Sequence, residues 1–386
     1  MSALPLAIIG SGLAGYMLAK EWRKLDTVSP LVIITADDGA FYSKPLLSTA
    51  LTQQKTAEQL VVATAEIQAQ ELNAKIIVLS TVTAIDPIAN TITTSNHGTL
   101  EFSRLVMACG AEVVAPKLAG DAVLTVQTVN DLCDYRRFRQ WLSDKRRLAI
   151  LGSGLVGCEF ANDLANAGYS VTLIAPDPHP LATVLPPVVG RLLQEQLAQL
   201  GVIWQLGHCA AAVNQRGSQI IITLSDGQEI CADGVFSAIG LRPRIQLARD
   251  AGIMVNRGIV VNRWLQTNFS HIFALGDCAE MEGLVQMYVA PLLQGARALA
   301  KILAGGREPV HYPVMPIVVK TPVLPLVFTA PPAHILGEWH VEGEGHHLRA
   351  LFHDQSGQLR GFALAGDKIR DKLPLAKQLP LVLSDG

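Results

Sequence analysis

The sequence lacks the features that would carry the chain into or across a membrane. No run of about 18 uninterrupted apolar residues occurs, so we expect no transmembrane helix. No Lys or Arg precedes the apolar stretch at the N-terminus, and that stretch runs directly into glycines, so we expect no signal peptide.

Cysteines are few and are not paired along the sequence. They stand at positions 109, 133, 158, 209, 231 and 278, and no two of them form a Cys-x-x-Cys or Cys-x4-Cys pair. This spacing gives no support for a metal site, a haem attachment site or a local redox disulfide. Their mostly apolar surroundings predict reduced, buried thiols in a cytoplasmic protein.

Charge is scarce and nearly balanced. Only 17% of the residues are charged and the net charge is -2, so no strongly basic face is implied and we expect no nucleic-acid partner. The apolar share of 49% excludes a disordered chain. A length of 386 residues exceeds what one core usually organises, so we expect two or three domains.

Two segments of the chain repeat one motif. Each is an apolar strand followed by the pattern G-x-G-x-x-G and an amphipathic stretch that predicts a helix. The first begins at Leu6 and its helix runs to about Leu25; the second begins at Leu148 and its helix runs to about Ala167. Another apolar strand follows each helix, at residues 31–34 and 171–174. This order predicts two α/β units with parallel strands.

The glycine spacing indicates a nucleotide pyrophosphate. The first glycine makes a tight turn, the second lets the backbone approach the phosphates, and the third lets helix and strand pack closely. The phosphates then meet free N–H groups at the start of the helix. Glycines that only turn a strand into a helix are the alternative, and the repetition weakens it. We therefore expect two dinucleotide sites, one at Gly10, Gly12, Leu13, Ala14 and Gly15 and the other at Gly152, Gly154 and Gly157.

An acid roughly 20 residues after each motif could hold ribose hydroxyls. Asp37 and Asp177 stand near that distance, although Thr35 and Ala175 occupy the strand ends, and both acids could instead be ordinary loop residues. Residues 175–180 include no Lys or Arg to meet a 2′-phosphate, which favours NADH over NADPH.

Two further segments have the pattern of a split FAD domain. Residues 105–111 predict a strand that ends in a small-residue turn, with Ala108 and Gly110 as candidate cofactor contacts. Residues 267–277 predict a strand that ends in Gly276-Asp277, where Asp277 could accept a hydrogen bond from the ribitol chain or could be a simple turn residue. Helical spacing of apolar residues then runs from Val289 to Leu303. The start of this helix could face the flavin.

These motifs together resemble the pyridine-nucleotide-dependent flavoprotein reductases of the glutathione-reductase-like fold. The resemblance covers about residues 5–380 and includes the segments 152–163, 239–243 and 276–280. Two narrower segments are similar to the branch that reduces rubredoxin: Tyr-Ser-Lys-Pro-Leu-Leu-Ser at 42–48 and Val-Lys-Thr-Pro-Val-Leu-Pro-Leu at 319–326.

The resemblance implies an α/β fold with two Rossmann-like dinucleotide-binding domains and a small C-terminal α+β domain. The FAD domain would comprise residues 1–113 and 241–312, the NADH domain residues 114–240, and the C-terminal domain residues 313–386. The resemblance further implies that Lys44 and Glu159 are catalytic and pair beside the flavin, and that Lys320 approaches it. The ordinary alternatives are two solvated lysines and an acid that favours a helix N-terminus. Pro45, Val82 and Val289 complete the expected cofactor contacts.

The implied reaction passes electrons from NADH through FAD to rubredoxin, as in alkane hydroxylation or oxygen defence. Residues 42–48 lack the cysteine pair that disulfide reductases carry beside the flavin, which argues against dithiol chemistry there and against an NADH oxidase or peroxidase. A reductase for flavorubredoxin or a [2Fe–2S] ferredoxin, or a non-enzymatic nucleotide sensor, remain as alternatives. We expect no metal, and a monomer or weak dimer. Arg242, Arg244 and Lys320 are candidates for a basic patch that attracts an acidic carrier.

Overall fold

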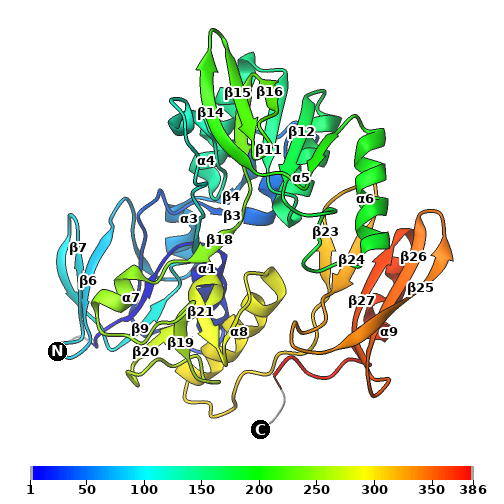
Figure 1. The fold of residues 1–386 in the computed structure, drawn as a ribbon. Coiled ribbons are helices and arrows are strands. Elements are labelled where there is room, and N and C mark those ends of the chain that lie inside the picture. Colours follow the sequence, from blue (N-terminus) through cyan, green and yellow to red (C-terminus); the bar gives the residue numbers. More distant parts are fainter. Residues whose placement is uncertain (1–2, 384–386) are drawn as a thin grey trace. The chain divides into compact units, whose positions relative to one another are not determined.

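The computed structural model describes residues 3–383, and the chain divides into two compact units (Figure 1). The first unit contains the chain up to Ser43, Gln59–Glu112 and Leu241–Tyr312, and the second contains Lys44–Glu58, Val113–Gly240 and the chain from Pro313. The sequence had placed residues 44–58 in the FAD domain, and here they fold with the second unit. Two of the boundaries between the units fall within the short elements α2 (Ala57–Leu60) and β10 (Ala111–Val113).

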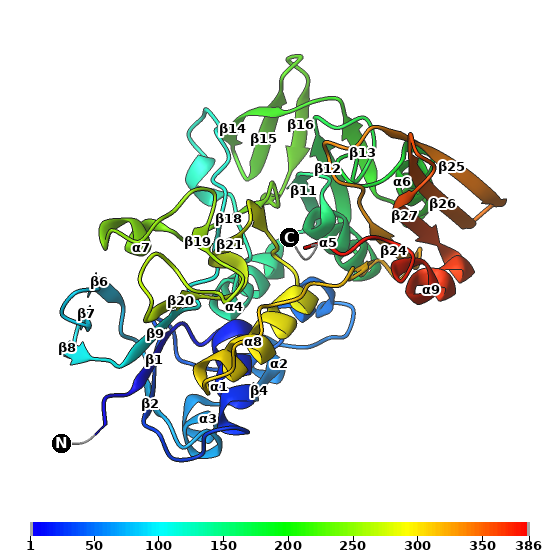
Figure 2. The same cartoon turned by 90° about the horizontal axis from the view of Figure 1, so that it is seen from below.

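The first unit is built on a five-stranded parallel sheet. Its strand order is β20-β9-β1-β2-β5, so the first strand of the chain lies at the centre. Its members are β1 (Leu6–Ile9), β2 (Leu31–Ile34), β5 (Lys75–Ile77), β9 (Arg104–Met107) and β20 (Ile272–Ala274). Every residue of β1 and β2 is buried, as expected of parallel strands covered on both faces. Helix α1 (Leu13–Arg23) follows β1 and packs beside α8 (Val289–Leu303), as Figure 2 shows.

Small sheets and short helices complete the first unit. The sheets are β3-β4, β6-β7-β8 and β19-β21-β22. Their strands are β3 (Phe41–Tyr42), β4 (Val61–Ala63), β6 (Val82–Asp86), β7 (Thr91–Thr94), β8 (Gly98–Glu101), β19 (Ile259–Val261), β21 (Ala279–Met281) and β22 (Leu284–Val285), accompanied by β18 (Leu241–Pro243), α3 (Ala65–Glu71), α7 (Gln246–Asp250) and the 3-10 helix η4 (Gly276–Cys278).

The second unit repeats the strand–helix–strand plan. Its parallel sheet has the order β13-β12-β11-β17, with β11 (Arg147–Leu151), β12 (Ser170–Ala175), β13 (Ile203–Leu206) and β17 (Gly234–Ser237). The unit's helices are η1 (Lys44–Thr49), η2 (Val123–Thr125), α4 (Leu132–Trp141), η3 (Leu142–Asp144), α5 (Leu155–Asn166) and α6 (Pro187–Gln199). The predicted repeat elements thus form within one or two residues of their expected ends.

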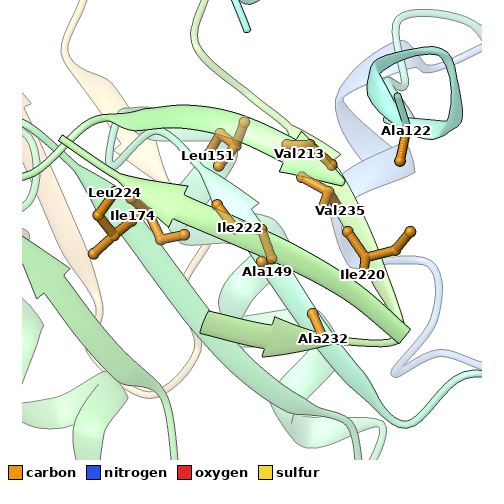
Figure 3. Close-up of a cluster of buried hydrophobic side chains, with 10 residues drawn as sticks. All are labelled: Ala122, Ala149, Leu151, Ile174, Val213, Ile220, Ile222, Leu224, Ala232 and Val235. Carbon is orange, nitrogen blue, oxygen red and sulfur yellow. The ribbon is translucent and has the colours of Figure 1, made fainter. Parts of the chain in front are cut away.

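An antiparallel sheet covers one face of this parallel sheet. It consists of β14 (Ala210–Arg216), β15 (Gln219–Leu224) and β16 (Glu229–Ala232). Figure 3 shows the shared core, in which Ile220, Ile222 and Leu224 of β15 meet side chains of β11 and β17. This apolar core holds the loop after β11, which carries the second glycine motif, against a rigid base.

The chain from Pro313 forms a five-stranded sheet of order β23-β24-β27-β26-β25. All of its neighbours pair antiparallel. The strands are β23 (Ile317–Val319), β24 (Leu326–Thr329), β25 (Gly337–Glu344), β26 (His347–Asp354) and β27 (Leu359–Ala365), followed by η5 (Gly366–Asp371) and α9 (Lys372–Ala376). Phe362, Leu364 and Leu375 belong to its buried core. Across residues 3–383, no helix has the length and apolar character needed to cross a bilayer.

Candidate functional site

The first glycine motif forms a cradle after β1. A Cβ atom on Gly10 would lie 2.3 Å from the carbonyl oxygen of Ala108, and one on Gly15 would lie 2.0 Å from that of Gly10. Gly10 also has φ +111°, which other residues rarely adopt. By contrast, a Cβ on Gly12 would meet no described atom within 4 Å. The first and third glycines are therefore required by the fold itself, whereas the second leaves room for a ligand.

The start of α1 is suited to an anion. Gly12 is its N-cap, no described side chain caps it, and its first turn carries no acid. The N–H groups of the first turn, at Leu13 and Ala14, therefore have no partner within the helix. Free N–H groups and the positive end of the helix dipole together fit a pyrophosphate, as predicted from the spacing.

Asp37 is tied to this cradle by its carboxylate. Its Oδ1 accepts hydrogen bonds from the Ser11 hydroxyl (3.0 Å), the Thr35 hydroxyl (2.6 Å) and the Gly39 N–H (2.9 Å). Ser11 is buried at 4% exposure, whereas Asp37 is exposed. The acid therefore orders the glycine loop, and a contact with ribose stays a prediction.

Other predicted FAD contacts follow neighbouring strands of the same sheet. Strands β20, β9 and β1 lie side by side and are parallel, so the turns after them share one edge. These turns carry Gly276-Asp277, Ala108–Gly110 and the first glycine motif. Gly276 has φ +81° and Gly110 has φ +68°. Three segments far apart in sequence therefore meet at the edge where α/β sheets bind ligands.

Two other predicted residues lie elsewhere in the first unit. Val289 is exposed and begins α8, whose N-terminus is not capped by any side chain among residues 3–383. Val82 begins β6, in the separate sheet β6-β7-β8.

The second motif repeats the same geometry in the second unit. A Cβ on Gly152 would lie 2.7 Å from the Ala238 carbonyl oxygen, and one on Gly157 would lie 2.0 Å from that of Gly152. A Cβ on Gly154, the N-cap of α5, would meet nothing within 4 Å among the described atoms. The Ser153 hydroxyl donates to Asp177 Oδ2 at 3.0 Å, as Ser11 does to Asp37. The unit thus offers a second dinucleotide cradle.

An ion pair with one buried partner links α5 to Lys320, the residue after β23. Glu159 on α5 is only 1% exposed, and its carboxylate is paired with the ammonium group of Lys320. The same carboxylate accepts hydrogen bonds from the Ser48 hydroxyl (2.7 Å) and the Lys320 backbone N–H (3.0 Å). Lys320 Nζ also donates to Ser48 Oγ at 2.8 Å. Lys320 is thus a partner of Glu159, and the pairing of Glu159 with Lys44 beside the flavin stays a prediction.

A second acid on α5 fixes the segment that begins at Lys44. Asp163 accepts the backbone N–H groups of Leu51 (3.0 Å) and Thr52 (2.9 Å). Burial raises the pKa of Asp163, although these hydrogen bonds oppose the shift. Because Glu159 and Asp163 stand four residues apart, they lie on one face of α5 and together hold η1 against it. This explains why residues 44–58 fold with the second unit.

Lys44 and Pro45 begin η1. The Lys44 ammonium donates to Asn130 Oδ1 at 2.7 Å. Ser48, Asn130 and Asp163 were not singled out from the sequence. The sequence feature that could have identified Asp163 is its position four residues after Glu159 on a helix that is otherwise mostly apolar.

The two arginines proposed to attract a carrier are both engaged. Arg242 is paired with Glu112 at 2.7 Å, and Arg244 Nη1 donates to the Cys109 carbonyl oxygen at 3.3 Å. Both are exposed. Their use in docking stays a prediction.

Two protein families match this chain. Residues 4–296 match the family described as pyridine nucleotide-disulphide oxidoreductase. Residues 309–379 match the rubredoxin binding C-terminal domain.

Relatives match along almost the whole chain. A rubredoxin-NAD(+) reductase from Alcanivorax borkumensis is 45% identical and the alignment covers 98% of this chain and 99% of that protein. A nitric oxide reductase FlRd-NAD(+) reductase from Aliivibrio fischeri is 35% identical, with coverage of 98% and 99%. Among solved structures, the covalent putidaredoxin reductase–putidaredoxin complex has a TM-score of 0.88 at 25% identity, covering 98% of this chain and 94% of that one. These matches confirm the predicted fold class and the cofactors FAD and NADH.

Proposed function

Because the chain belongs to the pyridine nucleotide-disulphide oxidoreductase family, we propose that it is a FAD enzyme that oxidises NADH and passes the electrons to rubredoxin. The observation that carries this proposal is the rubredoxin binding domain over residues 309–379. The rubredoxin-NAD(+) reductase of A. borkumensis, alike in sequence from end to end, supports it. The proposed setting is an electron-transfer chain of alkane hydroxylation or oxygen defence.

The two cradles divide the cofactors between them. We assign FAD to the first unit, because Gly276-Asp277 and Ala108–Gly110 share an edge with the first motif. NADH then belongs to the cradle around Gly154. Held at this edge, FAD would supply the chemistry that joins a two-electron hydride donor to a one-electron iron acceptor.

Glu159, Lys320 and Ser48 would set the charge where the two cofactors react. The carboxylate balances the ammonium of Lys320, and Ser48 bonds both of them. This arrangement holds the lysine in place with little net charge. Lys44, at the start of η1, would supply a further cation near the cofactors.

The second cradle favours NADH over NADPH. The Asp177 carboxylate accepts a hydrogen bond from the Ser153 hydroxyl, and a carboxylate at this place would repel a 2′-phosphate. No Lys or Arg stands among residues 175–180 to offset that charge.

We further propose that residues 1–113 and 241–312 act as the FAD domain apart from the segment 44–58. Residues 114–240 would act as the NADH domain, and the chain from 313 as the carrier-binding domain. A cytoplasmic monomer or weak dimer with no nucleic-acid partner fits the free thiols and the balanced charge.

A reductase for flavorubredoxin is the second candidate. Its support is the FlRd-NAD(+) reductase of A. fischeri, which is alike over the whole chain at 35% identity. The lower identity favours rubredoxin as the partner.

A panel of carriers tests the proposal. Purified protein is supplied with NADH and, in turn, rubredoxin, the rubredoxin domain of flavorubredoxin and a [2Fe–2S] ferredoxin. We expect the largest kcat/KM with rubredoxin. A larger value for either rival assigns the function to that carrier, and negligible turnover with all three supports a nucleotide sensor instead.

A further inference from the structure

The loop between β12 and α6 of the second unit has little conformational freedom. It comprises residues 176–186, and proline occupies positions 176, 178, 180 and 186. Proline fixes its own φ angle and keeps the residue before it out of the helical region. The 176–186 loop is therefore stiff, and it begins at the strand end beside the second cradle.

This loop is bonded to the second glycine motif at two points. Ser153, between the first two glycines, is 1% exposed, and its hydroxyl donates to Asp177. The Leu181 N–H also donates to the Ser153 carbonyl oxygen at 3.0 Å. In the first unit Ser11 bonds Asp37 in the same way, but among residues 3–383 no backbone N–H from the loop after β2 donates to the Ser11 carbonyl oxygen. The second cradle is thus tied to its neighbouring loop by one more bond.

Leu181 makes that extra bond from an unusual backbone conformation. Its φ is +55°, in the left-handed region that residues other than glycine rarely adopt. The residue is buried, and its carbonyl oxygen accepts the N–H groups of Val184 and Leu185, both at 2.9 Å. Such a conformation persists only where the surrounding structure fixes it. The loop therefore needs an anchor beyond its own preferences.

His179 provides the anchor. Its side chain is buried at 4% exposure, and Nδ1 lies 3.0 Å from the Pro180 carbonyl oxygen. Because a carbonyl oxygen can only accept, Nδ1 carries the hydrogen and donates it. The ring packs against Gly190 of α6, where a Cβ atom would lie 2.2 Å from Nδ1. Glycine is unfavourable inside a helix, and here it makes room for the imidazole, which joins the loop to α6 two residues before Leu181.

We propose that His179 is a positioning residue for NADH. The proposal rests on the assignment of NADH to the second cradle. With the imidazole against α6, Leu181 stays bonded to Ser153 and the loop is ordered before NADH arrives, so binding does not incur the cost of ordering it. The same anchor keeps the Asp177 carboxylate at the place where it disfavours a 2′-phosphate. His179 acts through the loop and takes no part in hydride transfer.

Rapid mixing with NADH tests the proposal in the purified, FAD-loaded protein. The rate of flavin reduction over a range of NADH concentrations gives the limiting rate and the NADH concentration at half of that rate. His179→Ala should raise the half-saturating concentration about tenfold, because the loop must then be ordered on binding, and should leave the limiting rate unchanged. The preference for NADH over NADPH should fall in the same variant. A merely structural role would lower the free energy of unfolding and leave these kinetic values as they are in the natural protein.

Two further variants assign the effect to the ring. In His179→Asn the side-chain amide takes the place of Nδ1 and donates to the Pro180 carbonyl oxygen, so most of the affinity for NADH should return. His353→Ala is the matched control, because His353 lies on β26 of the C-terminal sheet, where its ring contacts that of His340. Its half-saturating concentration should equal that of the natural protein.

Gly190→Ala tests the contact with α6 from the other side. The new Cβ would displace the imidazole, whereas alanine itself favours the helix. This variant should weaken NADH about as much as His179→Ala does. The double variant should be no weaker than either single variant, because both changes remove the same contact.

Three results would overturn the proposal. They are an unchanged half-saturating concentration in His179→Ala, a His179→Asn variant as weak as His179→Ala, and single effects that multiply in the double variant. If instead NADH had been assigned to the wrong cradle, Gly154→Val would leave the half-saturating concentration unchanged as well. The carrier is absent from this assay, so the result does not depend on which carrier the protein reduces.

Discussion

The two glycine motifs form nearly the same cradle, but the helices that leave them differ. The buried residues of α1 are apolar throughout, among them Tyr16, Leu18 and Trp22. The buried face of α5 carries Glu159, Asn162 and Asp163 instead. An apolar helix only supports its cradle, whereas α5 also holds η1 and Lys320 through charged groups. The comparison indicates that the first unit retains a cofactor and that the second positions reacting groups as well.

Replacing the second glycine of each motif with a larger residue should have the largest effect and should distinguish the two units most clearly. Gly12 and Gly154 both have extended backbone, with φ -67° and -73°, and a Cβ at either meets no described atom within 4 Å. Gly12→Val and Gly154→Val should therefore fold. Each should weaken its own nucleotide roughly a hundredfold, or by about 3 kcal/mol.

Bound flavin after gel filtration and the dissociation constant for NADH provide the two measurements. Gly12→Val should lose flavin, while Gly154→Val should stay yellow and bind NADH poorly. Each variant is the control for the other. Loss of the same nucleotide from both would contradict the assignment of one cofactor to each cradle.

Glu159→Gln should give the next largest effect. It leaves the Lys320 ammonium without its carboxylate, so reduction of the flavin by NADH should slow about tenfold, which equals about 1.4 kcal/mol of barrier. The free energy of unfolding should fall by about 1.5–3 kcal/mol, the range for a hydrogen bond to a charged group. Rapid mixing with NADH and urea unfolding measure the two effects.

The matched control is Glu229→Gln. Glu229 pairs with Arg216 at 3.0 Å on the exposed surface of the same unit. Surface pairs contribute little, so neither measurement should change. Equal effects in the two variants would remove the special role of Glu159.

Asp177→Arg should change the choice of nicotinamide cofactor. We expect the natural protein to prefer NADH at least tenfold in kcat/KM, and the new cation should narrow that gap by about tenfold, or about 1.4 kcal/mol. Asp37→Arg, at the matching place in the first unit, should leave the ratio of NADH to NADPH activity unchanged. A ratio that shifts in both variants would point to a general charge effect.

The smallest expected effect is on stability as a function of pH. Burial raises the pKa of Asp163 above its ordinary 3.8 in the folded protein, so its charged form is disfavoured there. The stability of the natural protein relative to Asp163→Asn should therefore fall as pH rises from 3.8 through the raised pKa. Urea unfolding at several pH values measures this difference.

Asp233→Asn should show the opposite trend. Burial opposes the shift, but hydrogen bonds from Arg147 and the backbone lower the pKa of Asp233. The stability that Asp233 contributes should be present at neutral pH and lost as pH falls through its lowered pKa. If both aspartates give the same slope, the inferred difference between buried and surface acids is wrong.

The fold could be predicted from the sequence wherever local pattern determines structure. The glycine motifs, the strands beside them and the helix from Val289 depend on residues that are close together in the chain. The setting of Glu159 could not be predicted this way, because Ser48 and Lys320 come from distant segments. The glycine spacing therefore predicts each nucleotide-binding loop, whereas the side chains that meet beside it depend on tertiary packing.

The most direct test of the central claim isolates electron delivery to the carrier. The protein is first reduced with NADH, and the excess NADH is removed. It is then mixed rapidly with oxidised rubredoxin or with an oxidised [2Fe–2S] ferredoxin while the flavin absorbance is followed. We expect rubredoxin to reoxidise the flavin much faster than the ferredoxin does. Equal rates with the two carriers would contradict the proposed function.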